Sequence, residues 1–173
     1  MTPEEYFILF SPHHLYMHNK PNRYLAFTKT YPTQARELVT TIWVAYEYMR
    51  SITNKITQFN AIRDTGATES MVTPKVVQTL KMPAVTRNKV KGVNSETLCN
   101  VYAIDLLLPN KFMIQNIHVT EASFPWGDFL IGMDIISLWD FAVTRKNQST
   151  VMSFVMPNLR MIDFEKEVKE TEI

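Results

Sequence analysis

The sequence predicts a single domain built mainly of β-strands. A chain of 173 residues with 46% hydrophobic content can bury one core, and its recurring segments of β-branched and aromatic residues are typical of strands. Helical patterns are confined to short stretches. The strand-like segments are residues 24–31, 38–49, 56–62, 89–101, 101–108, 112–120, 129–132, 141–145 and 150–156.

Residues 38–49 allow two interpretations. The spacing of their apolar residues would place several of them on one face of a helix, whereas the run Thr40-Thr41-Ile42-Trp43-Val44 favours a strand. We predict a strand that pairs with residues 56–62 across a polar turn at residues 51–55. This hairpin would present Asp64 at its end.

Three parts are expected along the chain. Residues 1–22 are polar and interrupted by prolines, which predicts a loosely attached arm. Residues 23–157 are expected to form the domain, with a short helix over residues 73–80 whose N-cap is Thr73. Residues 158–173 are strongly charged and predict a peripheral helix or tail.

Composition and charge exclude several classes of function. The net charge of +1 and the scattered basic residues give no field for nucleic acid or an anionic membrane. The single cysteine, Cys99, excludes an internal disulfide and fits a reducing compartment. The sequence has no leader-like start and no run long enough to span a bilayer. We therefore expect a cytoplasmic protein with neither nucleic acid nor membrane as a partner.

The candidate active residue is Asp64, which a short apolar run delivers onto a tight turn. Gly66 lets the backbone approach without a Cβ in the way, the Thr65 hydroxyl can brace the turn, and small Ala67 keeps its packing tight. Taken alone, Asp-Thr-Gly is a weak signal, because composition would give such a triplet in roughly one chain of this length in ten.

A second motif lies downstream, over residues 128–136, and consists of an apolar strand run, a glycine and the start of a short helix. Asp64-Thr65-Gly66-Ala67 followed by Leu130-Ile131-Gly132-Met133-Asp134 resembles the retropepsin-like aspartic peptidases, especially their bacterial members. The resemblance runs from about residue 23 to about residue 166. It implies a single-lobe, closed β-barrel-like domain with a flap hairpin and short helices, active as a homodimer.

The resemblance also implies roles for individual residues. Asp64 would be the catalytic acid, Thr65 would brace the pair of acids across the dimer, and Gly66 and Ala67 would form the turn and line the substrate site. The hairpin at residues 89–101 would be the flap, although an ordinary surface hairpin is an equal alternative. Its tip residues are Gly92, Val93, Asn94 and Ser95, and the structural residues of the second motif are Ile131, Gly132 and Asp134.

The chemistry of such a site requires two carboxylates that share a proton, because two like charges about 3 Å apart cannot both ionise. One carboxylate takes a proton from water, and the protonated one donates to the carbonyl of the substrate. The sequence offers one Asp-Thr-Gly, so the enzyme hypothesis requires a symmetric dimer with Asp64 from each chain on the two-fold axis. The substrate would be a peptide or protein, and no metal or organic cofactor is implied.

Arg63 departs from the pattern, because relatives usually carry an apolar or aromatic residue before the acid. A guanidinium there would be buried at high cost or would reach solvent by distorting the strand, and it could lower the pKa of Asp64. The alternative hypothesis is therefore a catalytically impaired domain of the same fold that binds peptides or dimerises. A third hypothesis, a metal-dependent hydrolase, rests only on His13, His14 and His18.

Overall fold

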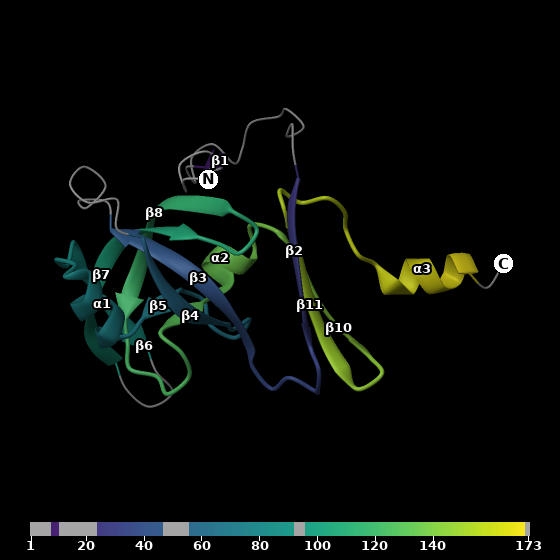
Figure 1. The fold of residues 1–173 in the computed structure, drawn as a ribbon, viewed down its shortest axis with the longest axis horizontal. Coiled ribbons are helices and arrows are strands. Elements are labelled where there is room, and N and C mark those ends of the chain that lie inside the picture. The colour runs from purple at the N-terminus through teal and green to yellow at the C-terminus, as the bar shows by residue number, and fades with distance from the viewer. Residues whose placement is uncertain (1–7, 11–23, 47–55, 92–95, 172–173) are drawn as a thin grey trace.

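The computed structural model describes residues 8–10, 24–46, 56–91 and 96–171, which form a closed β-barrel and a separate three-stranded sheet (Figure 1). This confirms the predicted mainly β fold with a closed barrel. The barrel strands are β3 (Leu38–Tyr46), β4 (Thr57–Arg63), β5 (Met71–Val72), β7 (Glu96–Leu107), β8 (Phe112–Glu121) and β9 (Phe129–Ile131). Strand β6 (Thr86–Lys91) extends the sheet beside β7, and pairing of β7 with β8 closes the barrel.

Strand β4 lies between β3 and β9 in the barrel wall, and the acid turn follows its last residue. It runs antiparallel to β3, with Leu38 opposite Arg63 and Val44 opposite Thr57, and parallel to β9. Along β3, Thr40, Ile42 and Val44 are buried at alternate positions. A period of two is the pattern of a strand, so the strand interpretation of this segment is confirmed over residues 38–46.

Helix α1 (Pro74–Leu80) covers one end of the barrel and buries Val76 and Leu80. Pro74 stands at its start, where a missing N–H has no cost, as predicted. Thr73 occupies the N-cap position, but its hydroxyl makes no capping bond. The predicted N-cap position of Thr73 is thus confirmed, and its hydroxyl donates to the carbonyl oxygen of Asp128 at 3.1 Å, which links α1 to the start of the second motif.

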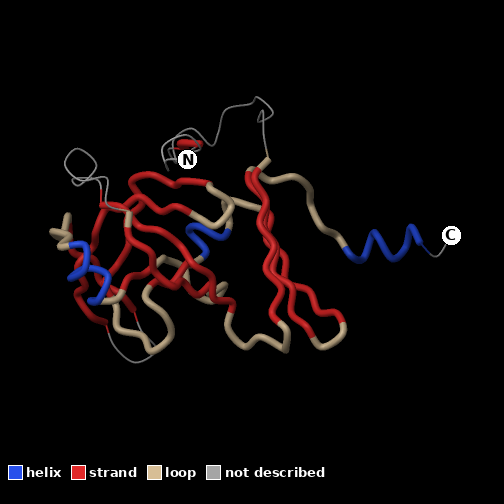
Figure 2. The backbone as a smooth tube through the Cα atoms, viewed as in Figure 1, coloured by secondary structure: helices blue, strands red, loops and turns tan. Residues whose placement is uncertain are grey.

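The three-stranded sheet consists of β10 (Asp140–Lys146), β11 (Ser149–Met156) and β2 (Leu25–Tyr31) in that order. The predicted hairpin of β10 and β11 is confirmed, and β2 adds to it with Phe27 opposite Phe154. Figure 2 shows these three strands lying together beside the barrel. The face of β11 that carries Met152, Phe154 and Met156 is buried in the common core.

Strand β1 and helices α2 and α3 complete the described part of the fold. Strand β1 (Ile8–Phe10) pairs in parallel with β8, so the segment predicted to be an irregular arm contributes one short strand. Helix α2 (Met133–Ile136) is the short helix of the second motif and buries Ile135 and Ile136. Helix α3 (Phe164–Thr171) extends away from the three-stranded sheet and buries none of its residues (Figure 1). Among the elements just described, no helix has the length and apolar character needed to cross a membrane.

Helix α3 should contribute little to the stability of the domain, because Phe164 and Val168 are exposed and its two ion pairs lie within the helix. A chain ending at Ile162 keeps the Leu159 and Arg160 N–H groups that donate to the Asp140 carboxylate, and it should therefore unfold within about 2 °C of the full-length chain in a thermal melt. Full-length protein carrying Asp163→Asn serves as the control for small changes in surface charge. A fall of several degrees on truncation alone would mean that α3 packs against the domain in solution.

Candidate active site

The acid turn is held by hydrogen bonds on both sides of Asp64. The Asp64 N–H donates to the carbonyl oxygen of Ile131 at 3.0 Å, and the Ala67 N–H donates to the carbonyl oxygen of Asp64 at 3.3 Å. The Gly66 N–H donates to Oδ1 of Asp64 at 2.8 Å, which fixes the carboxylate over its own turn. The side chain of Asp64 is exposed, so the carboxylate is fixed in orientation and open to a ligand or a second chain.

The second motif anchors this turn through Asp134 and Ser70. The Asp134 carboxylate accepts hydrogen bonds from the Ser70 N–H at 3.0 Å and from the Ser70 hydroxyl at 2.8 Å. The Ser70 Oγ in turn accepts from the Gly132 N–H at 3.0 Å, and the Met133 N–H donates to the carbonyl oxygen of Ala67 at 2.8 Å. The two motifs, far apart in sequence, are thus one hydrogen-bonded unit.

Gly132 is required by the close approach of these two segments. A Cβ built on Gly132 would lie 2.7 Å from the carbonyl carbon and oxygen of Glu69 and 3.1 Å from the carbonyl oxygen of Ala67. Backbone atoms cannot move aside as the end of a flexible side chain can. At Gly66, by contrast, the nearest neighbour of a Cβ is Oδ1 of Asp64 at 3.2 Å, which is a side-chain atom.

An apolar surface lies beside the acid on the same side of the sheet. Ile62 and Leu130 sit opposite each other in the parallel pair of β4 and β9, and Met71 of β5 is opposite Leu130. These side chains are half-buried and alternate along their strands with fully buried ones. Because Asp64 follows Arg63 at the end of β4, its carboxylate lies on the same side as Ile62.

Arg63 is buried, with 5% of its surface exposed, and it remains in the regular register of β4, opposite Leu38 and Ile131. Its Nη1 donates to the hydroxyl of Thr40, and its Cζ lies 5.0 Å from the ring centroid of Phe154. Its Nε and Nη2 have no hydrogen-bond partner among the residues that the structure describes. Of the two alternatives open for the guanidinium, burial and escape to solvent by distortion of the strand, the structure has burial in an undistorted strand.

The charge of Arg63 opposes folding. Burial lowers the pKa of Arg63 to about 10, and the nearby Tyr31 counteracts part of this shift. The folded state therefore holds this proton less tightly than the unfolded chain, and the charged side chain costs stability at every pH below about 10. The guanidinium is nevertheless protonated at neutral pH, on the face of β4 opposite to Asp64.

Several residues singled out from the sequence are only partly placed. The two arms of the predicted flap hairpin, β6 and β7, pair antiparallel, with Lys91 opposite Glu96. The tip residues Gly92, Val93, Asn94 and Ser95 lie outside the described part of the chain. Thr65 is exposed on the acid turn. The histidines at 13, 14 and 18 also fall outside the description, and elsewhere no group of three or more His, Cys, Asp or Glu side chains could hold a metal ion.

The fold is similar to solved aspartic proteases, although no protein-family model and no curated protein matches the sequence significantly. A retropepsin-like aspartic protease from Rickettsia conorii superposes with a TM-score of 0.51 and 12% identity, over 80% of this chain and 98% of that chain. The EIAV protease in complex with the inhibitor HBY-793 gives a TM-score of 0.46 and 18% identity, over 62% and 90% of the two chains. The simian foamy virus protease gives 0.35 and 14%, over 57% and 92%. At such identities the likeness to the first protein shows a shared fold and nothing finer.

Gly132→Ala should destabilise the domain by at least about 2 kcal/mol, because its Cβ would collide with the Glu69 backbone. Gly66→Ala is the matched control at the other motif. There the Cβ meets only the movable carboxylate of Asp64, so the loss of stability should be smaller. Both losses are measured by denaturant unfolding. Equal losses would contradict the account of how the two motifs pack.

Arg63→Met should leave the unfolding temperature unchanged or raise it. Methionine fills a similar space and removes a buried charge with two unpartnered N–H groups, each of which costs about 1–3 kcal/mol. These gains offset the lost Thr40 hydrogen bond and the contact with Phe154. Arg63→Ala is the control, because it leaves a cavity and should destabilise the domain. A Tm for Arg63→Met as low as that of Arg63→Ala would show that the charge itself stabilises the fold.

Proposed function

We propose that this protein is an aspartic endopeptidase that hydrolyses peptide bonds as a homodimer, with water activated between two Asp64 carboxylates. The observation that carries the proposal is the geometry of the acid turn. An exposed carboxylate accepts the Gly66 N–H within a turn that the Ser70–Asp134 unit anchors from behind. Such rigid support is what a catalytic acid needs in order to be held in a productive orientation.

The proposed reaction uses no group beyond the two carboxylates and water. When two Asp64 side chains meet at a two-fold axis, their like charges cannot coexist at about 3 Å, and one proton is shared between them. The ionised carboxylate removes a proton from the attacking water. The protonated one donates to the carbonyl oxygen of the scissile bond, which gives a neutral tetrahedral intermediate. Thr65, exposed next to the acid, is proposed to brace the pair across the dimer.

A free sheet edge supports a second copy of the chain as the partner. Within the described residues, β10 pairs with β11 along one side and with no strand along the other. Unpaired edges of this kind invite pairing with another strand. An antiparallel pair of β10 strands about a two-fold axis would bring the acidic start of the strand, Asp140, near the basic end of its copy, which carries Arg145 and Lys146.

The substrate is proposed to be a peptide or protein with apolar side chains next to the scissile bond. The half-buried surface of Ile62, Leu130 and Met71 beside the acid would accept such side chains. The hairpin tip at residues 92–95 is proposed to close over the bound peptide. The binding-module alternative rested on Arg63, and its guanidinium is held on the other face of β4 by Thr40 and Phe154, which favours the enzyme.

Asp64→Asn should abolish cleavage of a mixed peptide library assayed between about pH 4 and 7, a loss of at least about a thousandfold in kcat, because an amide can neither accept nor share the proton. Pepstatin should inhibit the unchanged protein. Asp163→Asn is the matched control, since Asp163 is exposed and belongs to the segment before α3. Peptide binding without cleavage by a dimeric wild-type protein would instead establish the binding module.

A further inference from the structure

Packing alone does not explain the buried charge of Arg63. An apolar side chain of similar length would fill the same space without the free-energy cost of burying a charged group. Two N–H groups of Arg63 find no acceptor among the described residues, and no carboxylate pairs with it there. Proteins retain such unfavourable groups mainly at functional sites, where the group performs a task that a better-packed residue would not. The position directly before Asp64 makes the acid turn the place to look for that task.

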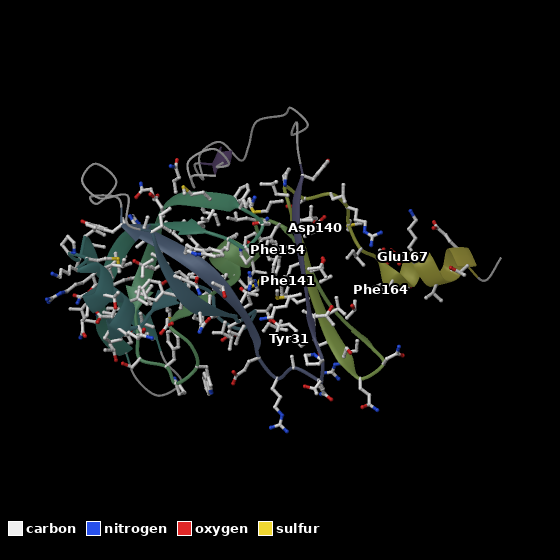
Figure 3. The ribbon with its side chains drawn as sticks, viewed as in Figure 1. Tyr31, Asp140, Phe141, Phe154, Phe164 and Glu167 are labelled. Carbon is white, nitrogen blue, oxygen red and sulfur yellow. The ribbon has the colours of Figure 1, made fainter. Side chains whose placement is uncertain are left out.

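The partner that Arg63 reaches is the centre of an aromatic cluster. The guanidinium lies over the ring of Phe154, and Trp139 stacks on the same ring at 4.9 Å between centroids. Phe27 of β2 adds a tilted contact with Phe154 at 5.6 Å. Figure 3 shows Phe154 and Phe141 on the side of the three-stranded sheet that faces the barrel. A cation over the face of an aromatic ring is attracted to the ring, and the attraction depends on their relative orientation.

Side-chain contacts connect both ends of the acid turn to the ring of Phe154. On one side, Arg63 contacts Phe154 and is followed directly by Asp64. On the other side, Trp139 stacks on Phe154 and follows α2, whose Asp134 holds Ser70 behind the turn. The turn is therefore tied to one side chain of β11 by two routes, of which only the Arg63 route brings a charged group onto the ring.

We propose that Arg63 is a positioning residue that aligns Asp64 by fixing the end of β4 against Phe154. The proposal rests on the proposed protease function for its catalytic consequence, but the alignment itself is a property of the fold. It also assigns a role to the three-stranded sheet. The sheet that offers its free edge β10 to a second copy is the same sheet that orients the acid, so pairing and acid geometry would be mechanically linked.

The test compares Arg63→Met with the wild-type protein by amide hydrogen exchange at Asp64 and Ala67, together with kcat and KM. Loss of the directional contact should speed exchange at these two amides by about tenfold or more while Tm does not fall. In the same variant kcat should fall by about tenfold to a hundredfold with KM nearly unchanged, as expected when a reacting group is misplaced. Phe59→Leu is the matched control. It lies on the same buried face of β4, four residues before Arg63, and should lower Tm without changing exchange at the turn.

Phe154→Leu removes the Arg63 contact from the other side, together with the Trp139 stack, so the test does not depend on one variant folding. It should speed exchange at least as much as Arg63→Met does, and adding Arg63→Met to it should have little further effect. Unchanged exchange at Asp64 and Ala67 in both single variants, or fully additive effects in the double variant, would overturn the positioning role. If the wild-type protein cleaves nothing yet Arg63→Met loosens the turn, the proposed protease function fails and the positioning role stands.

Discussion

The hydrogen-bonded unit of Asp134, Ser70 and Gly132 is the interaction on which the site depends. It joins the turn after β4 to the start of α2, and it brings the two backbones so close that a Cβ on Gly132 has no room. Every other feature of the site follows from this contact. The carboxylate of Asp64 has a fixed orientation because the turn beneath it cannot move independently of the barrel, and the apolar surface beside it is formed by the adjacent strands β4, β9 and β5.

Arg63 shows how a locally unfavourable residue can belong to an otherwise consistent fold. Burial lowers the pKa of its guanidinium, and the side chain satisfies only one of its donor groups with Thr40. Around Arg63, more buried and less buried side chains alternate along the strands, and Phe27 and Trp139 pack against Phe154. The domain therefore tolerates a cost at one position because the rest of its core is well formed, and this position adjoins the proposed catalytic acid.

The sequence predicted the elements of the fold better than their long-range contacts. Most strands, the short helices and the hairpin of β10 and β11 follow from local patterns, so they were predicted, whereas the short strands β1 and β5 were not. The parallel addition of β1 to β8 and the pairing of β2 with β11 join distant segments, which no local pattern reports. At the site, Asp64 and Gly132 were visible in two motifs. Ser70 was not assigned a role, because nothing in the local sequence marks it as functional. Its role depends on a hydrogen bond with Asp134, which is distant in sequence and close only in the folded chain.

The most direct test of the shared-acid account is to mix wild-type protein with Asp64→Asn, let the chains exchange, and measure peptide cleavage against the fraction of wild-type chains. If each active site needs one Asp64 from each of two chains, mixed dimers are inactive. At equal amounts roughly a quarter of the activity should then remain, following the square of the wild-type fraction. Retention of about half, in linear proportion, would mean that each chain acts alone and would contradict the account.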